Sequence, residues 1–193
     1  MKELTDKALW RKIKRKDKIA FHQLYDRYGI ELFNYGIKIT TNQETIKDVI
    51  QHLFMDIWER AGTRTIPNHI KAYLLKSFRN NLLRGIKKEQ KSNQYNIELE
   101  KEPISITDLF GNSEQEDRIR QIQLAIKKLP PRQKEIIHLR YYQGLSNNEI
   151  AELIDINPQS TANLIHRSIS SLKAIIVNKK LFQLFIITTF YFS

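Results

Sequence analysis

Residues 144–167 read GLSNNEIAELIDINPQSTANLIHR, and this stretch decides the fold of the C-terminal part of the chain. Ser146 followed by Glu149 is the pattern of a capping box, in which the serine bonds forward and the glutamate reaches back. The apolar residues that follow have the spacing of a short helix, and Pro158 suits the first position of the next helix. Two helices joined by a short turn predict a helix-turn-helix.

The flanking helices are predicted from the same kinds of signal. Leu129-Pro130-Pro131 begins a helix that runs through Gln143, and the last helix runs from about Pro158 to Ile176. The inward side chains of the last helix are expected to be Thr161, Ile165, Ile169 and Leu172. Asp155 stands in the turn, where many such turns have glycine. Aspartate tolerates the left-handed backbone better than most residues do.

The second helix of a helix-turn-helix enters the major groove by its N-terminal part. Its outward side chains are therefore the candidates for contacts with DNA. They are polar groups and one arginine, which suit hydrogen bonds to base edges and a phosphate anchor. The predicted DNA-binding residues of this helix are Gln159, Ser160, Asn163, His166 and Arg167. A plain helical hairpin is the alternative for this segment.

Residues 1–90 are predicted to form a second helical domain. Thr5 or Asp6 caps a short helix, and Asp17 caps the next one. In a third helix, apolar residues from Ile46 to Trp58 follow the 3.6-residue helical period. The other face of that helix is a candidate protein-binding surface or a merely solvated face. Its residues include Asp48, Gln51, His52 and Met55.

A fourth helix, capped by Asn68, combines an apolar side with a basic one. From Arg60 to Lys88 the chain has eight Lys and Arg residues and no acid. An aromatic ring beside cations suits single-stranded nucleic acid, because bases stack on rings while cations follow the phosphates. The candidate residues are Arg64, Asn68, Lys71, Tyr73, Lys76, Arg79 and Asn80. A solvated charged face is the alternative.

The whole chain is strongly basic. Its 193 residues carry a formal net charge of +11, which points to nucleic acid or an anionic membrane surface as a partner. Residues 91–118 reverse that sign, with seven acids against three bases, and are interpreted as a linker or an ordinary solvated loop. The absence of cysteine excludes disulfide frameworks, Cys-ligated zinc and thiol catalysis. The scattered histidines give no cue for a catalytic, metal or cofactor site.

Together these motifs resemble the bacterial RNA polymerase sigma factors of the sigma-70 family, specifically the small extracytoplasmic-function (ECF) type. Residues 48–51 with Phe54 and Trp58 look like part of region 2 of that family, as does Arg79-Asn80. Residues 129–133 and 144–151 look like its region 4, and His166-Arg167-Ser168 ends the recognition helix in the family's manner. The chain has Tyr73, Arg84 and Ala162 where the family often has Trp, Asp and Lys.

The resemblance implies an all-α protein with two small helical domains joined by a flexible linker. We expect a region 2 domain at 1–90, the linker at 91–118, a region 4 domain at 119–178 and an apolar segment at 179–193. The implied function is that of a promoter-specificity subunit in the cytoplasm, with no enzymatic activity, cofactor, metal or small-molecule substrate. The implied partners are core RNA polymerase (its beta-prime and beta subunits), promoter DNA and an anti-sigma factor, which in this family is commonly membrane-bound.

The resemblance also implies a role for each candidate surface. Asp48, Gln51, His52 and Met55 would dock on the polymerase. The basic helix and the loop before it would hold the melted minus-ten element, and the recognition helix would read the minus-thirty-five element.

Two other classes of protein stay open. A helix-turn-helix regulator that does not act as a sigma factor would explain residues 120–176, but it leaves the Asp48–Trp58 helix without a role. A membrane-anchored protein is suggested by the uncharged apolar segment Leu181–Ser193, which is shorter than the ~20 residues that span a bilayer. We expect this segment to pack on the second domain or to await a partner protein. The opening residues, MKELTDK, have no apolar signal region.

Overall fold

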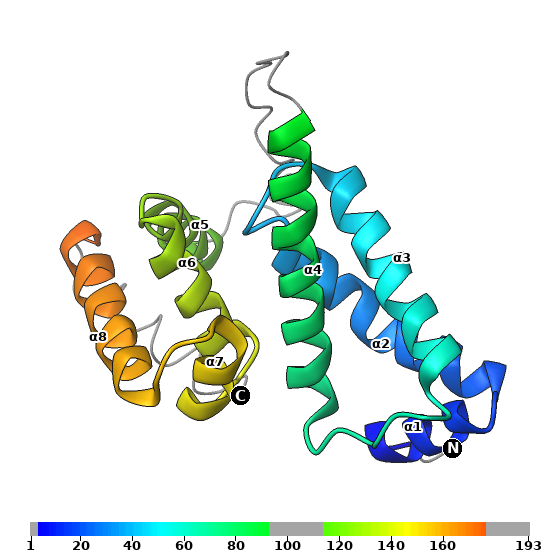
Figure 1. The fold of residues 1–193 in the computed structure, drawn as a ribbon. Coiled ribbons are helices and arrows are strands. Elements are labelled where there is room, and N and C mark those ends of the chain that lie inside the picture. Colours follow the sequence, from blue (N-terminus) through cyan, green and yellow to red (C-terminus); the bar gives the residue numbers. More distant parts are fainter. Residues whose placement is uncertain (1–3, 93–113, 177–193) are drawn as a thin grey trace. The chain divides into compact units, whose positions relative to one another are not determined.

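The computed structural model describes residues 4–92 and 114–176. The chain divides into two compact units, an N-terminal unit (Met1–Lys101) and a C-terminal unit (Glu102–Ser193). Every regular element among the described residues is helical (Figure 1), which confirms the all-α prediction.

The N-terminal unit contains four helices in the described range: α1 (Asp6–Lys14), α2 (Lys18–Gly36), α3 (Gln43–Arg60) and α4 (Ile70–Ser92). Helix α2 packs against α1, α3 and α4, and α3 also packs along α4 (Figure 1). Helix α2 is thus the central contact of this unit.

Side-chain caps fix where the first three helices begin. Thr5, Asp17 and Asn42 each accept a hydrogen bond from the backbone N–H three residues ahead, at 3.4, 3.1 and 3.2 Å. The predictions of Thr5 and Asp17 as caps are confirmed. For α4 the predicted cap Asn68 is wrong. That helix begins at Ile70, and its first backbone hydrogen bond is accepted by His69, which therefore occupies the capping position.

The core of the N-terminal unit is built from the apolar stripes that the sequence predicts. Trp10, Tyr35, Phe54 and Phe78 are its largest fully buried side chains. The Tyr35 and Phe78 rings lie 6.0 Å apart between centroids, which joins α2 to α4. Aromatic groups of this size dominate the energetics of burial.

Helix α2 approaches its neighbours most closely at Gly36. A Cβ atom at this position would lie 2.7 Å from Cγ2 of Ile46 on α3 and 3.0 Å from Cζ of Phe78 on α4. Only a residue without a side chain permits this packing, because both neighbours are themselves fully buried. Gly62, in the α3–α4 loop, has no such neighbour within 4 Å.

The C-terminal unit contains α5 (Glu114–Lys127), α6 (Pro131–Ile137), a π-helical turn η2 (His138–Tyr142), α7 (Asn147–Ile154) and α8 (Pro158–Ile175). Helices α6 and α7 both pack against α8, and α5 also contacts it. A buried cluster joins α5, α6 and α8; it consists of Ile122, Ala125, Leu129, Ile137 and Leu172. Two of the four predicted inward residues of α8, Thr161 and Leu172, are buried, and Ile165 and Ile169 are half-buried.

The structure differs from the sequence prediction in two places in this unit. The helix predicted through Gln143 ends as an α-helix at Ile137 and continues as a π turn, in which the Gln143 N–H donates to the His138 carbonyl at 3.0 Å. The His138 ring stacks on the Tyr142 ring across this turn, 5.4 Å between centroids. Residues 114–118, predicted as the end of the linker, lie in α5.

The predicted apolar segment at 179–193 and most of the predicted linker lie outside the described residues. Within residues 4–92 and 114–176, no helix combines the length and apolarity that crossing a membrane requires.

We expect Gly36→Ala to lower the free energy of unfolding by about 1–3 kcal/mol, because the added methyl group overfills a packed core. Urea unfolding of the full chain, followed by circular dichroism, measures this change. Gly62→Ala is the matched control and should leave stability nearly unchanged. Equal stability of the two variants would contradict the close packing at Gly36.

Candidate nucleic-acid interface

The helix-turn-helix is fixed at its start by a capping box at α7. The Glu149 N–H donates to Oγ of Ser146 at 3.3 Å, and the Ser146 N–H donates to Oε2 of Glu149 at 2.8 Å. Both reciprocal bonds of the predicted motif are therefore present. They satisfy two backbone donors that the helix itself cannot satisfy.

The turn between α7 and α8 is fixed by Asp155 and Asn157. Asp155 has left-handed backbone angles, with φ 59° and ψ 52°, as the sequence predicted for this turn. The Ile156 N–H donates to the Ala151 carbonyl at 3.0 Å and closes α7. Oδ1 of Asn157 then accepts the Ser160 N–H at 2.7 Å and begins α8, with Pro158 in its first turn.

The predicted DNA-binding residues of α8 all lie on its solvent side. Gln159, Ser160, Asn163, His166 and Arg167 are exposed. Nε2 of Gln159 lies 3.4 Å from Oδ1 of Asn163, so these two side chains occupy adjacent turns of one face. The inward side carries Thr161, Ser168 and Leu172. The hydroxyls of Thr161 and Ser168 donate to backbone carbonyls one turn earlier in the chain. The polar face is thereby left to solvent.

The basic surface of the N-terminal unit is less uniformly positive than the sequence predicts. Lys71 forms an ion pair with Glu31 of α2 at 2.7 Å. Arg60 and Arg64 both pair with Asp56 of α3, at 2.9 and 2.8 Å. The stretch 60–88 has no acid of its own, but packing brings carboxylates to it from two other helices. Lys76, Arg84, Lys87 and Lys88 are exposed on α4.

The residues predicted to bind single-stranded DNA differ in how deeply they are buried. Tyr73 is half-buried, its hydroxyl accepts a hydrogen bond from Nη1 of Arg64 at 2.5 Å, and its ring meets the Trp10 ring edge-on at 5.6 Å. Asn68 and Lys76 are exposed, whereas Arg79 and Asn80 are half-buried. Arg64 and Tyr73 are therefore brought together.

The four predicted polymerase-binding residues lie along one side of α3, and all are exposed. Met55 keeps 49% of its surface exposed, so it offers an apolar contact among the polar residues of this side. His52 bonds locally, with Nδ1 donating to the Asp48 carbonyl at 2.7 Å. Asp48 and Gln51 lie on the preceding turns of the same helix.

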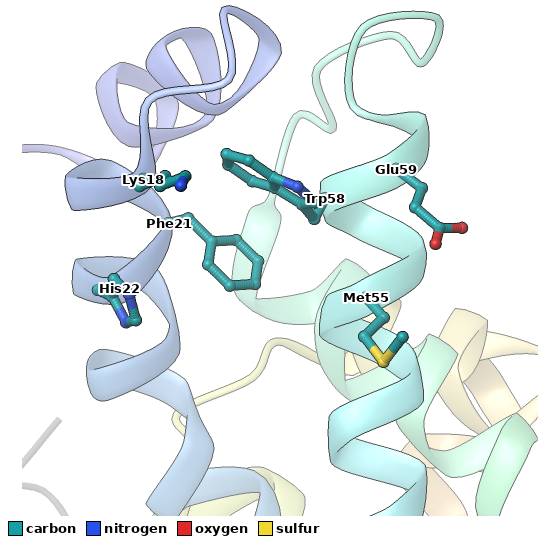
Figure 2. Close-up of a pocket in the computed structure, with 6 residues that line it drawn as sticks. All are labelled: Lys18, Phe21, His22, Met55, Trp58 and Glu59. Carbon is teal, nitrogen blue, oxygen red and sulfur yellow. The ribbon is translucent and has the colours of Figure 1, made fainter.

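A shallow pocket adjoins this surface, and sequence reasoning missed it. It encloses about 290 Å³ between α2 and α3 (Figure 2). The Phe21 and Trp58 rings meet within it at 5.1 Å between centroids, and both are only half-buried. Its lining residues are Lys18, Phe21, His22, Met55, Trp58 and Glu59. The helical period assigned Phe21 and Trp58 to the core, so the only sequence signal was an exposed Met55 beside two aromatics.

The capped helices α7 and α8 and the turn between them place the C-terminal unit in the class of helix-turn-helix proteins. The N-terminal unit adds the basic helix α4. Residues 119–172 match the family described as Sigma-70, region 4. These residues span the helix-turn-helix and most of α5.

Two curated proteins are similar in sequence to most of this chain. The ECF RNA polymerase sigma factor BldN of Streptomyces coelicolor is 24% identical over 158 residues, which cover 79% of this chain but only 59% of BldN. The ECF RNA polymerase sigma factor SigK of Mycobacterium tuberculosis is 21% identical over 172 residues, which cover 86% of this chain and 90% of SigK.

Two solved structures share the fold. One is CnrH in complex with the cytosolic domain of CnrY, with a TM-score of 0.60, 18% identity and coverage of 89% of this chain and 96% of that chain. The other is the sigma factor RpoE in complex with the anti-sigma factor NepR from Bartonella quintana, with a TM-score of 0.64, 19% identity and coverage of 82% and 98%. Residues 119–172 are thus similar to region 4 of the sigma-70 family, and most of the chain is similar to ECF sigma factors.

We expect Ser146→Ala to destabilise the C-terminal unit by about 1 kcal/mol, because the Glu149 N–H in the first turn of α7 loses its acceptor. Thermal unfolding of the full chain measures this loss. Glu152→Ala changes an exposed residue on the same helix and should have a smaller effect. If both variants unfold alike, the capping box is not what fixes α7.

Proposed function

We propose that this chain is an ECF sigma factor, which binds core RNA polymerase and directs initiation at promoters through two separate contacts with DNA. The observation that carries the proposal is the capped helix-turn-helix within the region 4 match, with the polar face of α8 exposed. The exposed basic residues of α4 support the second contact.

The C-terminal unit would read the minus-thirty-five element as duplex DNA. Near the start of α8, Gln159, Ser160 and Asn163 offer hydrogen-bond donors and acceptors that match base edges in the major groove. Arg167, two turns after Ser160, would anchor phosphate, and His166 beside it would add a polar contact. Asn157 and Pro158 hold the start of this helix, so its reading face is preorganised.

The N-terminal unit would hold one strand of the melted minus-ten element. Melting a duplex costs stacking energy, and capture of unpaired bases by an aromatic ring beside cations offsets that cost. Tyr73 would supply the ring and Arg64 the adjacent guanidinium. Further polar and cationic contacts would come from the loop and α4, through Asn68, Lys71, Arg79 and Asn80. Lys76 would follow the phosphates, since it is exposed to solvent.

Helix α3 would provide the contact with the polymerase. Asp48, Gln51, His52 and Met55 present a mixed polar and apolar face, which is typical of protein interfaces. The pocket beside Met55 extends this face with two aromatic rings. We expect the beta-prime subunit to contact this surface, and the beta subunit to contact another part of the chain.

The two DNA contacts would act together because they belong to one chain. Tethering raises the effective concentration of the second contact once the first has formed, provided that the promoter spacing fits. The predicted domains at 1–90 and 119–178 and the linker at 91–118 stay proposals in this scheme. Neither domain then needs high affinity by itself.

The remaining predictions concern location and regulation. Since transcription takes place in the cytoplasm of bacteria, we propose that the chain acts there, as a binding subunit without enzymatic activity. RpoE of Bartonella quintana binds the anti-sigma factor NepR. By analogy we propose that an anti-sigma factor, membrane-bound or not, controls this chain.

Reconstitution with core polymerase tests the proposal. Start sites are mapped after overexpression in cells, and the DNA upstream of one of them serves as template for run-off transcription. We expect initiation from this template with the chain as the sole specificity subunit. A helix-turn-helix regulator, the alternative, would give no transcript without another sigma factor.

The recognition helix is tested by Arg167→Ala in the same holoenzyme. We expect promoter binding to weaken by about 1–3 kcal/mol, because a phosphate or base contact is lost. Fluorescence anisotropy at one fixed salt concentration measures it. Lys127→Ala removes an equal charge from an exposed position on α5 and should leave binding nearly unchanged. Equal losses would show that α8 acts only through net charge.

A further inference from the structure

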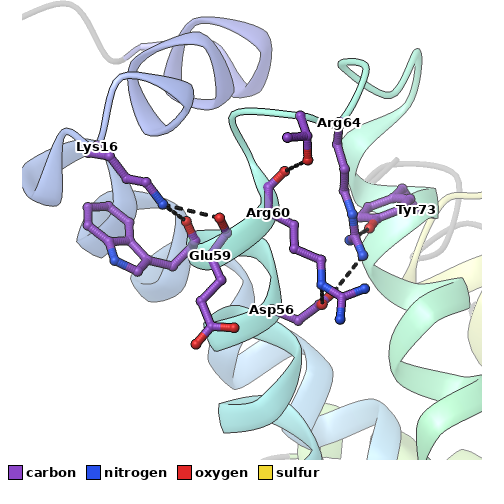
Figure 3. Close-up of polar contacts among 8 residues, drawn as sticks. Lys16, Asp56, Glu59, Arg60, Arg64 and Tyr73 are labelled. Carbon is purple, nitrogen blue, oxygen red and sulfur yellow. Dashed lines mark hydrogen bonds and ion pairs between the residues drawn. The ribbon is translucent and has the colours of Figure 1, made fainter.

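Arg64, in the loop between α3 and α4 (residues 61–69), is held by a carboxylate of α3 (Figure 3). Oδ1 of Asp56 accepts from Nε of Arg60 at 2.9 Å, and Oδ2 accepts from Nη2 of Arg64 at 2.8 Å. Nη1 of Arg64 then donates to the Tyr73 hydroxyl at 2.5 Å. Asp56 is therefore linked through Arg64 to the first turn of α4.

Two lysines also hold the backbone of this loop and of the last turn of α3. Nζ of Lys14 donates to the Arg64 carbonyl at 2.9 Å. Nζ of Lys16 donates to the Trp58 carbonyl at 2.5 Å and lies 5.1 Å from the centroid of the Trp58 ring. A cation at the Trp58 carbonyl is favourable, because that carbonyl belongs to the C-terminal end of α3, where the helix dipole is negative.

The Tyr73 end of this series of contacts is fixed in the core. The Tyr73 ring meets the Trp10 ring edge-on, with an interplanar angle of 88°. Trp10 is fully buried, so it cannot move without disturbing the core. The series Asp56, Arg64, Tyr73 and Trp10 thus runs without a break from the surface of α3 to the interior.

Two roles for Asp56 can be distinguished on this geometry. As a counter-charge, it would neutralise Arg60 and Arg64 and weaken their attraction for DNA. As a positioning residue, it would orient them for DNA. The contacts to Asp56 and Tyr73 engage only two of the five N–H groups of the Arg64 guanidinium. They therefore orient the arginine and leave it further donors for a phosphate or a base. The half-buried Arg64 side chain, 30% exposed, fits the second role.

We infer that Asp56 is a positioning residue, which holds Arg64 and Tyr73 in one arrangement ready for an unpaired DNA strand. This inference rests on the proposed function of the N-terminal unit. Its physical advantage is preorganisation. A loop that is ordered before binding loses less conformational entropy when the strand arrives.

The test is Asp56→Asn in the reconstituted holoenzyme. The probe is a fluorescent single-stranded oligonucleotide with the nontemplate sequence upstream of a mapped start site. We expect the affinity for this strand to fall about tenfold, as a loosened loop pays the ordering cost on binding. The affinity for core polymerase should stay unchanged. Simple electrostatics predicts the opposite direction, because the variant removes one negative charge beside a polyanion.

The matched control is Asp26→Asn, which makes the same charge change at an exposed position on α2. Its affinity for the strand should be equal to that of the unaltered chain or slightly higher. Tyr73→Phe provides a second test that removes only the hydroxyl bonded by Arg64. We expect about a threefold loss from it, and no additional loss when it is combined with Asp56→Asn, because both act through one series of contacts.

Each other outcome overturns the inference. Tighter strand binding by Asp56→Asn would make the carboxylate a counter-charge, and unchanged binding would give it no role in strand capture. A parallel loss of polymerase affinity would make Asp56 a polymerase contact. The proposed function fails separately, if the unaltered chain directs no transcription. If that chain is active but Asp56→Asn behaves like Asp26→Asn, only the positioning role is lost.

Discussion

The N-terminal unit depends on the burial of the apolar stripe of α4, a helix whose other side is strongly basic. Its apolar stripe is buried against α2 and α3, which brings its cations close to both helices. Glu31 of α2 pairs with Lys71 on α4, and Asp56 of α3 pairs with Arg64 in the loop before α4. Glu89, near the end of α4, accepts a hydrogen bond from Thr45 at the start of α3. Pairing restrains the cations nearest the core, whereas Lys76 and Lys88 remain in solvent. The same packing therefore separates structural charges from charges available to a polyanion.

Local signals in the sequence predicted most of the fold. The caps at Thr5, Asp17 and Ser146 and the apolar period of α3 involve residues close together in the chain, so they can be recognised without a structure. Ion pairs such as Lys71 with Glu31 join distant segments and could not be recognised. The π turn at His138 was missed because its residues fit an ordinary α-helical period.

The candidate site could be predicted to a similar extent. The outward face of α8 follows from the register of one helix, and its five predicted residues are indeed exposed. The pocket at Phe21 and Trp58 was missed because both residues satisfy the periodicity of a core, and only tertiary packing decides how deeply each is buried. The partnership of Arg64 with Tyr73 likewise depends on the path of a loop, which periodicity does not determine.

The helix-turn-helix uses one set of side chains to fold and another to face the solvent. Ser146, Glu149, Asp155 and Asn157 build its turns and helix ends, while the exposed residues from Gln159 onward take no part in that construction. Mutation can therefore alter one set without touching the other. A lineage of such proteins could acquire new target sequences through successive changes at the surface, each intermediate still folding, and so diverge into regulators of different genes.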